Sequence, residues 1–235
     1  MTTTSTYHPS CDNSIAVEET GLTVSFTTKF DGHVGFPLEG SSLDVEVARH
    51  KFVDLKWVSL HQVHSNKVAI YDERLQYAST EGDAIVGIPN DVAFAVFGAD
   101  CAIIGLLSTE GIAGVVHAGW RGLVNGIIPN AVRTMREIGA TNIFAVRGPC
   151  IHSECYEFSE DELLRVNSSL GYDVSGVTKK GSPALDLPKS IRYELTKEGV
   201  EVLAESNMCT FCSDFYFSYR RNGTNMRQGL VVYRS

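Results

Sequence analysis

The stretch VAFAVFGADCAIIGLLSTEGIAGVVHAGWRG, residues 92–122, decides the fold of this 235-residue chain. It contains three short apolar runs, Val92–Phe97, Ala102–Leu107 and Ile112–Val116, with glycine-containing turn signals between them. Short apolar runs rich in β-branched residues are typical of buried strands. The stretch therefore predicts three central strands of a sheet, with polar residues at the points where the strands end.

Further strands and helices are predicted on either side of this stretch. Strands are expected over residues 22–27, 56–60, 142–146, 214–219 and 229–233. Helices are expected over residues 46–50, from Gly122 to Ile138, from the capping box Ser159/Glu162 onward, and between Asp186 and Gly199. Pro129 marks either a bend or a late start in the second helix. This order predicts an α+β (mixed α/β) fold, a compact layered sandwich of mixed sheets flanked by helices.

The composition is that of a globular protein, with 43% hydrophobic and 20% charged residues. We expect a loose polar tail over residues 1–20 and a single domain over residues 21–235. No run reaches the roughly 18 apolar residues of a membrane helix, and the start lacks the pattern of a secretory signal, so we expect a cytoplasmic protein. A net charge of −8 with scattered acidic residues disfavours nucleic-acid binding.

The six cysteines are expected to be free thiols, because a chain of this length builds a core without disulfides. The string Cys209-Thr-Phe-Cys212 has C-x-x-C spacing, which alone favours structural thiols or a redox pair over a second zinc site. Cys150 and Cys155 flank His152, and that loop is also a weak metal candidate on spacing alone. The sequence assigns these four cysteines no definite role.

Three short polar strings stand where predicted strands emerge: His61-Gln-Val-His64, Gly98-Ala-Asp-Cys101 and the string HAGWRG over residues 117–122. Side chains at such positions are rigidly placed yet accessible. A thiolate and two neutral imidazoles suit zinc, and three protein ligands leave the open coordination position of a catalytic site. Their separations of 37 and 16 residues match no short zinc pattern, so purely structural roles stay open on spacing alone.

These strings, together with His117–Leu123, resemble the signature of the laccase-domain family. Its members were first described as multicopper polyphenol oxidase-like proteins and later as purine nucleoside phosphorylases. The resemblance covers nearly the whole chain from Phe26 onward. It continues through the blocks Gly148-Pro149, Tyr156-Glu157, Leu185-Asp-Leu187, Cys209-Thr210 and Phe217-Ser-Tyr-Arg-Arg221.

The resemblance implies that His64, Cys101 and His117 are the catalytic metal ligands. It implies zinc, with copper as the other metal to consider. The implied reaction is phosphorolysis of adenosine, inosine and methylthioadenosine to free base and ribose 1-phosphate, with adenosine deamination as a side activity. The implied partners are a nucleoside and phosphate, for a monomer or homodimer.

The substrate contacts are less defined than the metal ligands. Arg121, Arg220 and Arg221 are candidate phosphate ligands, because guanidinium groups bind anions in a bidentate manner. Tyr219 or Phe217 is a candidate to stack on a purine. Lys29 stands where the family usually has arginine, and a lysine keeps the charge but loses the planar fork. Thr224-Asn-Met-Arg227 also departs from the family's Thr-Gly-Arg, so substrate preference is open to change.

Three other functions compete with this hypothesis. Cys101 as nucleophile and His117 as its base would give a hydrolase or amidase, such as a peptidoglycan-precursor editing enzyme. Copper-dependent phenol oxidation also uses two histidines and a cysteine, but seven histidines are too few for several coppers. A binding module without catalysis would tolerate Cys101→Ala. Metal content separates the first of these from the nucleoside enzyme.

Overall fold

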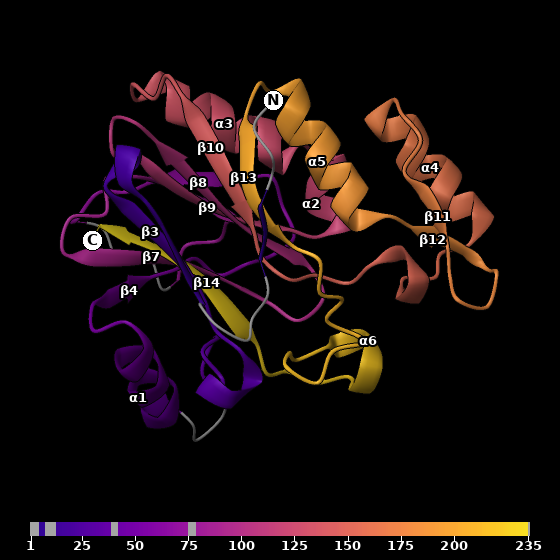
Figure 1. Cartoon of the computed structure of the whole chain (residues 1–235), viewed down its shortest axis with the longest axis horizontal. Coiled ribbons are helices and arrows are strands. Elements are labelled where there is room, and N and C mark those ends of the chain that lie inside the picture. The colour runs from indigo at the N-terminus through magenta and orange to yellow at the C-terminus, as the bar shows by residue number, and fades with distance from the viewer. Residues whose placement is uncertain (1–4, 8–12, 39–41, 75–78, 235) are drawn as a thin grey trace.

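A seven-stranded mixed sheet forms the middle of the molecule (Figure 1). The computed structural model describes residues 5–7, 13–38, 42–74 and 79–234. The strand order in this large sheet is β1-β13-β10-β8-β9-β6-β5. The strands are β1 (Ser5–Tyr7), β13 (Glu201–Ser206), β10 (Ile143–Arg147), β8 (Ala102–Ser108), β9 (Ala113–Ala118), β6 (Ala84–Gly87) and β5 (Val68–Ile70).

A five-stranded mixed sheet packs against one face of the large sheet, with the order β2-β3-β14-β7-β4. These strands are β2 (Ser14–Val17), β3 (Leu22–Phe26), β14 (Gln228–Arg234), β7 (Val92–Gly98) and β4 (Lys56–Val58). Side chains such as Phe26 and Phe94 from the small sheet and Ile103 and Val115 from the large sheet are buried together between them. The observed mixed sheets with flanking helices confirm the predicted fold class.

Helices cover the two outer faces. The large sheet packs against α2 (Trp120–Val124), α3 (Ile127–Glu137) and α5 (Leu187–Lys197), while α4 (Glu160–Leu170) packs against α2. The helix α1 (Ser42–Phe52) lies beyond the small sheet in Figure 1. A two-stranded ribbon of β11 (Ser175–Val177) and β12 (Pro183–Leu185) lies beside α4. Short 3-10 turns occur at η1 (Glu18–Thr20), η2 (Lys29–Asp31) and η3 (Ser153–Cys155). None of the helices within the described ranges is long and apolar enough to cross a bilayer.

The helix signals in the sequence are largely confirmed. The Ser159 side chain accepts from the Glu162 amide and the Glu162 carboxylate accepts from the Ser159 amide, which is the predicted capping box. Asp186 caps α5 by accepting from the Lys189 amide. The single helix predicted from Gly122 to Ile138 is instead two helices, α2 and α3, divided at Gly126, whose φ is 81°. Pro129 lies in the first turn of α3, where no amide is needed, so it marks a late start and not a bend. α1 is longer than the predicted 46–50 helix.

The predicted strand over residues 214–219 is wrong. This segment forms turns and leads into α6 (Tyr219–Asn222), which ends at Gly223. Its backbone groups are satisfied by side chains instead of a neighbouring strand. The Phe217 amide donates to Gln228 Oε1 over 2.8 Å, and Gln228 Nε2 donates to the Phe217 carbonyl over 3.2 Å. A segment with alternating apolar residues can therefore form a packed loop when polar side chains supply the backbone hydrogen bonds that a neighbouring strand would otherwise provide.

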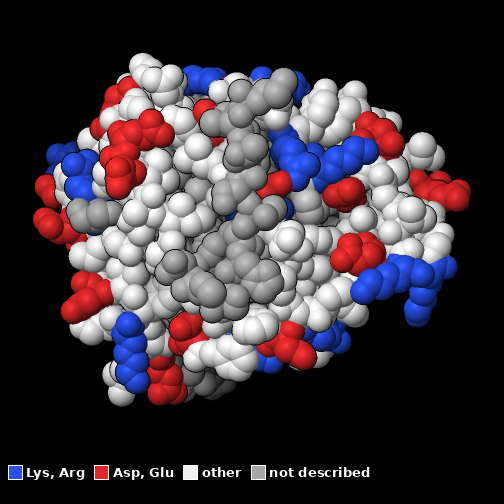
Figure 2. Space-filling view, in the orientation of Figure 1, with Lys and Arg blue, Asp and Glu red and all other residues white. Residues whose placement is uncertain are grey.

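The N-terminal region also differs from the loose tail expected over residues 1–20. Ser14–Val17 forms β2, which pairs antiparallel with β3, and Ser5–Tyr7 pairs parallel with β13. β5, β6, β11, β12 and β13 lie outside the predicted strands as well. Cys11 lies outside the described residues. Figure 2 shows acidic and basic side chains interspersed over one face, in agreement with the scattered charge of the sequence.

Candidate metal centre

The strand registers bring three polar residues to one end of the large sheet. β8 and β9 are antiparallel, with Ile103 opposite His117, so Cys101 at the start of β8 lies beside the end of β9. β6 pairs Ala84 with Val116, which places Asp83 next to His117 on the other side. Asp83, His117 and Cys101 therefore come together through register alone.

His64 reaches the same place from the loop between β4 and β5. Its backbone has φ of 59°, a left-handed conformation that is uncommon for a residue with a Cβ. The buried carboxylate of Asp83 holds this loop, since it accepts from the His64 amide over 3.0 Å and from the Ser65 amide over 2.6 Å. Strained backbone that is fixed by surrounding hydrogen bonds is common at functional sites.

The metal-binding atoms of His64, Cys101 and His117 all lie within 4.8 Å of one another. Cys101 Sγ lies 3.7 Å from His64 Nε2. Two ligands of a tetrahedral zinc ion, at about 2.1 Å for nitrogen and 2.3 Å for sulfur, are roughly 3.6 Å apart. His117 Nδ1 donates to Asp83 Oδ1 over 2.8 Å, which leaves His117 Nε2 for an ion and orients the ring.

Gly119 leaves room for this group. A Cβ at this position would lie 2.8 Å from Cys101 Sγ and 3.1 Å from His64 Cδ2. The backbone of Gly119, with φ of −79° and ψ of 169°, is accessible to any residue, so the close approach and not the conformation requires glycine. The space in front of the three ligands and the donor set both fit a zinc ion.

Electrostatics favour the charged forms of the site's residues. Burial raises the pKa of Asp83, but hydrogen bonds from His117 and Ser65 outweigh it and hold the pKa at about 2. Burial also opposes ionisation of Cys101, yet the interactions with His117 and His64 lower its pKa below the usual value for a thiol. The neighbouring Cys101 and Asp83 raise the pKa of His117 although burial acts against this. These shifts favour the thiolate form of Cys101 and the protonated form of His117, whose proton a bound metal ion would displace.

The three ligands open into a cavity of about 470 Å³. Aromatic rings make up much of its wall, and its lining includes Phe36, Phe97, Trp120, Tyr156 and Tyr219. A cavity of this size with several aromatic rings suits a flat, drug-sized ligand.

Cationic side chains line the same cavity. The guanidinium of Arg121 lies 4.5 Å from the Trp120 ring centroid, and that of Arg220 lies 4.9 Å from the Tyr156 centroid. Arg227 is a third cation in the lining. Stacking on an aromatic ring fixes a guanidinium and leaves its edge free to bind an anion.

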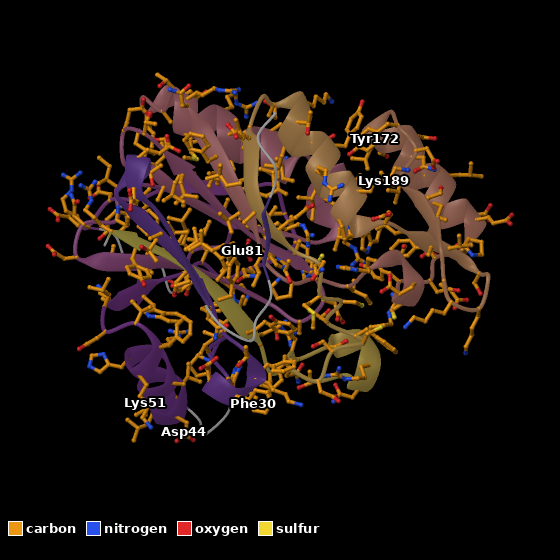
Figure 3. All side chains as sticks on the ribbon, in the orientation of Figure 1. Phe30, Asp44, Lys51, Glu81, Tyr172 and Lys189 are labelled. Carbon is orange, nitrogen blue, oxygen red and sulfur yellow. The ribbon has the colours of Figure 1, made fainter. Side chains whose placement is uncertain are left out.

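Two of the predicted substrate contacts do not line this cavity. The Arg221 guanidinium donates to four backbone carbonyls, those of Thr210, Phe211, Ser213 and Tyr216, so it holds the preceding loop together. Lys29 Nζ lies 5.4 Å from the centroid of the Phe30 ring. Figure 3 shows Phe30 beside Asp44 and Lys51 near α1, and these residues line a separate hollow. Arg121, Tyr219 and Arg220 remain as candidate contacts.

Sequence reasoning missed several residues of the site. Asp83 gave no motif signal, because a single aspartate before a strand is common. Asp100 is buried and has φ of 108°, and its carboxylate accepts from Thr210 Oγ1 over 2.7 Å and from the Arg220 amide over 2.6 Å. It thereby ties α6 to the turn that carries Cys101. Tyr156 lies in Tyr156-Glu157, one of the sequence blocks shared with the laccase-domain family, and that resemblance was the available sign of its role in the site.

A family model described as multi-copper polyphenol oxidoreductase laccase matches residues 42–234. A purine nucleoside phosphorylase of Streptomyces coelicolor is 36% identical over 194 residues, which cover 81% of this chain and 77% of that protein. A purine nucleoside phosphorylase of Corynebacterium glutamicum is 34% identical over 187 residues, covering 76% of this chain and 74% of the relative.

Solved structures share the fold. The hypothetical protein YfiH of Bacillus licheniformis superposes with a TM-score of 0.82 at 24% identity, covering 93% of this chain and 94% of that one. YlmD of Geobacillus stearothermophilus superposes with a TM-score of 0.80 at 25% identity, covering 97% of this chain and 98% of that one. The arrangement of two mixed sheets is therefore that of known proteins.

Proposed function

Because this chain belongs to the multi-copper polyphenol oxidoreductase laccase family, and its relatives from Streptomyces and Corynebacterium are named purine nucleoside phosphorylases, we propose that it cleaves purine nucleosides with phosphate. One observation carries the proposal. A single cavity combines a candidate metal-binding triad with aromatic rings and guanidinium groups. Nucleoside phosphorolysis needs a site for the purine and a site for the anion, which the aromatic rings and the guanidinium groups supply.

The metal is zinc in this proposal, bound by His64, Cys101 and His117. One thiolate and two imidazoles are ligands that zinc prefers, and Gly119 leaves them unobstructed. The open coordination position would supply a Lewis acid at the cavity wall. Asp83 positions this centre by hydrogen bonding the ring of His117 and the loop of His64.

The chain's own side chains bind and orient the two substrates. The purine stacks on the aromatic wall of the cavity, with Tyr219 as the candidate ring. Phosphate binds to Arg121 and Arg220, whose stacked guanidinium groups present several donors to one anion. The ribose then lies between the anion and the base.

In the reaction a phosphate oxygen bonds to C1′ of the ribose as the bond from C1′ to the purine nitrogen breaks. The products are ribose 1-phosphate and the free base, which takes up a proton as it departs. Glycosyl transfers pass through a cationic sugar, so an anion held beside C1′ stabilises the transition state. The arginines thus position the nucleophile and the cavity excludes competing water.

The test is product analysis with inosine, adenosine or methylthioadenosine, each with and without phosphate. We expect base and sugar 1-phosphate in equal amounts, only when phosphate is present: ribose 1-phosphate from inosine or adenosine, and 5-methylthioribose 1-phosphate from methylthioadenosine. Base release that is independent of phosphate, or none with any of the three, would contradict the proposal. Adenosine without phosphate measures the proposed deaminase side activity, which yields inosine and ammonia.

A second candidate is supported by a specific arrangement. Asp83, His117 and Cys101 form an acid–imidazole–thiol relay like that of cysteine hydrolases, and His117 lowers the pKa of the thiol against burial. Such an enzyme would cleave an amide through Cys101 without a metal. Alkylation of Cys101 separates the two functions. Zinc protects the thiol in the nucleoside enzyme, whereas a hydrolase is inactivated by alkylation and is unaffected by removal of zinc.

A further inference from the structure

A second group of sulfur atoms lies outside the candidate metal centre. Cys155 ends η3, and Cys209 and Cys212 lie in the turn that follows β13. The sulfurs of these three cysteines lie within 4.8 Å of one another, although 54 residues separate Cys155 from Cys209. Cys155 Sγ and Cys212 Sγ are 3.2 Å apart. The fold thus converts a C-x-x-C pair into a cluster of three thiols.

Backbone hydrogen bonds around Cys209 fix the position of its sulfur atom. Cys209 forms an isolated parallel bridge with Cys150, and the Thr210 amide donates to the Cys150 carbonyl over 3.0 Å. The His152 amide donates to Cys209 Sγ over 3.4 Å, and the amides of Phe211 and Cys212 also hydrogen bond to this sulfur. These amide donors fix the position of the Cys209 sulfur, and they act against the burial that raises the pKa of this thiol.

A cation stands next to the cluster. Lys179 Nζ lies 3.4 Å from Cys212 Sγ. Three thiolates around a divalent ion carry a net charge of −1, and one lysine beside them neutralises it. Two thiols that merely form a disulfide need neither a third sulfur nor a nearby cation.

We propose that Cys155, Cys209 and Cys212 bind a second ion, a zinc ion that cross-links the η3 loop to the turn after β13. Thiolates select zinc among the common divalent ions, and C-x-x-C is the usual spacing of two of its ligands. Cys212 is exposed, so the fourth position is open to a water molecule. Binding releases the thiol protons to solvent, with no change of oxidation state.

This second zinc ion would stabilise the wall of the cavity that contains the candidate catalytic centre. Tyr156 follows Cys155 directly and lines that cavity. Thr210 follows Cys209, and its hydroxyl donates to Asp100, which holds the turn of Cys101. The second ion is therefore structural, and it lies beside the candidate catalytic centre without sharing a ligand with it.

The experiment counts zinc by elemental analysis in reduced protein that has been stripped, reloaded and freed of excess metal. We expect two ions per chain in the wild type, one in Cys212→Ser, one in Cys101→Ser, and none in the double variant. Cys150→Ala is the matched control, because Cys150 is a neighbouring thiol outside the cluster, and it should retain two ions. Equal zinc content in Cys212→Ser and the wild type would overturn the proposal, whatever the outcome at Cys101.

A second measurement uses the wild type alone, so it does not depend on how a variant folds. Cobalt replaces zinc, and thiolate-to-cobalt absorption reports how many sulfurs bind. The alkylation rate of Cys212 is followed by peptide mapping. We expect zinc to slow this alkylation at least tenfold. An unchanged rate, or a Cys155–Cys212 disulfide whose reduced thiols take up no metal, would also overturn the proposal.

Discussion

Substitution of Gly119 by alanine tests the metal centre with a single methyl group. The new Cβ would lie 2.8 Å from Cys101 Sγ, whereas ordinary contacts begin near 3.4 Å, so the sulfur must move by at least about 0.6 Å. Metal–ligand distances tolerate only about 0.2 Å. We expect zinc affinity to fall by at least about 100-fold, which corresponds to about 2.7 kcal/mol. The metal-free fold should keep its stability, because alanine accepts this backbone conformation.

The assay is a competition titration with a chromophoric chelator, combined with thermal unfolding of the metal-free protein. Gly122→Ala is the matched control in the same segment, since the atoms nearest to its Cβ are Ile127 Cγ2 and the Ser65 carbonyl oxygen at 3.3 Å and the His117 carbonyl oxygen at 3.7 Å, and none of these is a metal-binding atom. It should bind zinc like the wild type. Wild-type affinity in Gly119→Ala would refute the reasoning, because it would mean that the methyl group does not displace Cys101 Sγ from its position for metal binding.

Three further outcomes are expected. Asp83→Asn should lower zinc affinity about 10- to 100-fold, because His117 loses its charged acceptor, and unchanged affinity in the same titration would contradict this. Arg121→Ala should raise KM for phosphate by about tenfold or more and leave KM for the nucleoside nearly unchanged, as initial rates at varied phosphate will determine. The pKa of Asp83 is lowered to about 2 from its usual 3.8, so the ionised carboxylate stabilises the folded state fully above pH 4. This stabilisation is lost as the pH falls through 2. In metal-free protein, the difference in unfolding free energy between the wild type and Asp83→Asn should therefore narrow by about 2 kcal/mol between pH 6 and pH 2, and a constant difference in urea titrations would refute this.

The central strands were predictable because they are short apolar runs that the chain must bury. β7, β8 and β9 lie within one or two residues of their predicted bounds. The caps at Ser159 and Asp186 were also predictable, since capping depends on neighbouring residues. The three candidate metal ligands were predicted from motif and family resemblance, while their proximity depends on the registers of β6, β8 and β9 and on the loop that carries His64.

Long-range contacts explain what the sequence left out. The cluster of Cys155, Cys209 and Cys212 depends on a bridge between distant loops, so spacing alone disfavoured it. The segment 214–219 has strand-like alternation, but the side chains of Gln228 and Arg221 satisfy its backbone. The local sequence pattern does not reveal these hydrogen-bond partners, because they are distant in sequence and come close only in the folded protein.

X-ray absorption at the zinc edge, on zinc-loaded Cys212→Ser protein, measures the coordination of the candidate catalytic centre directly. In this variant the proposed second ion is absent, so the spectrum reports one site. The account predicts a single sulfur at about 2.3 Å and two imidazole nitrogens at about 2.0–2.1 Å, together with one lighter ligand. A shell without sulfur, or with two or more sulfurs, would contradict binding by His64, Cys101 and His117.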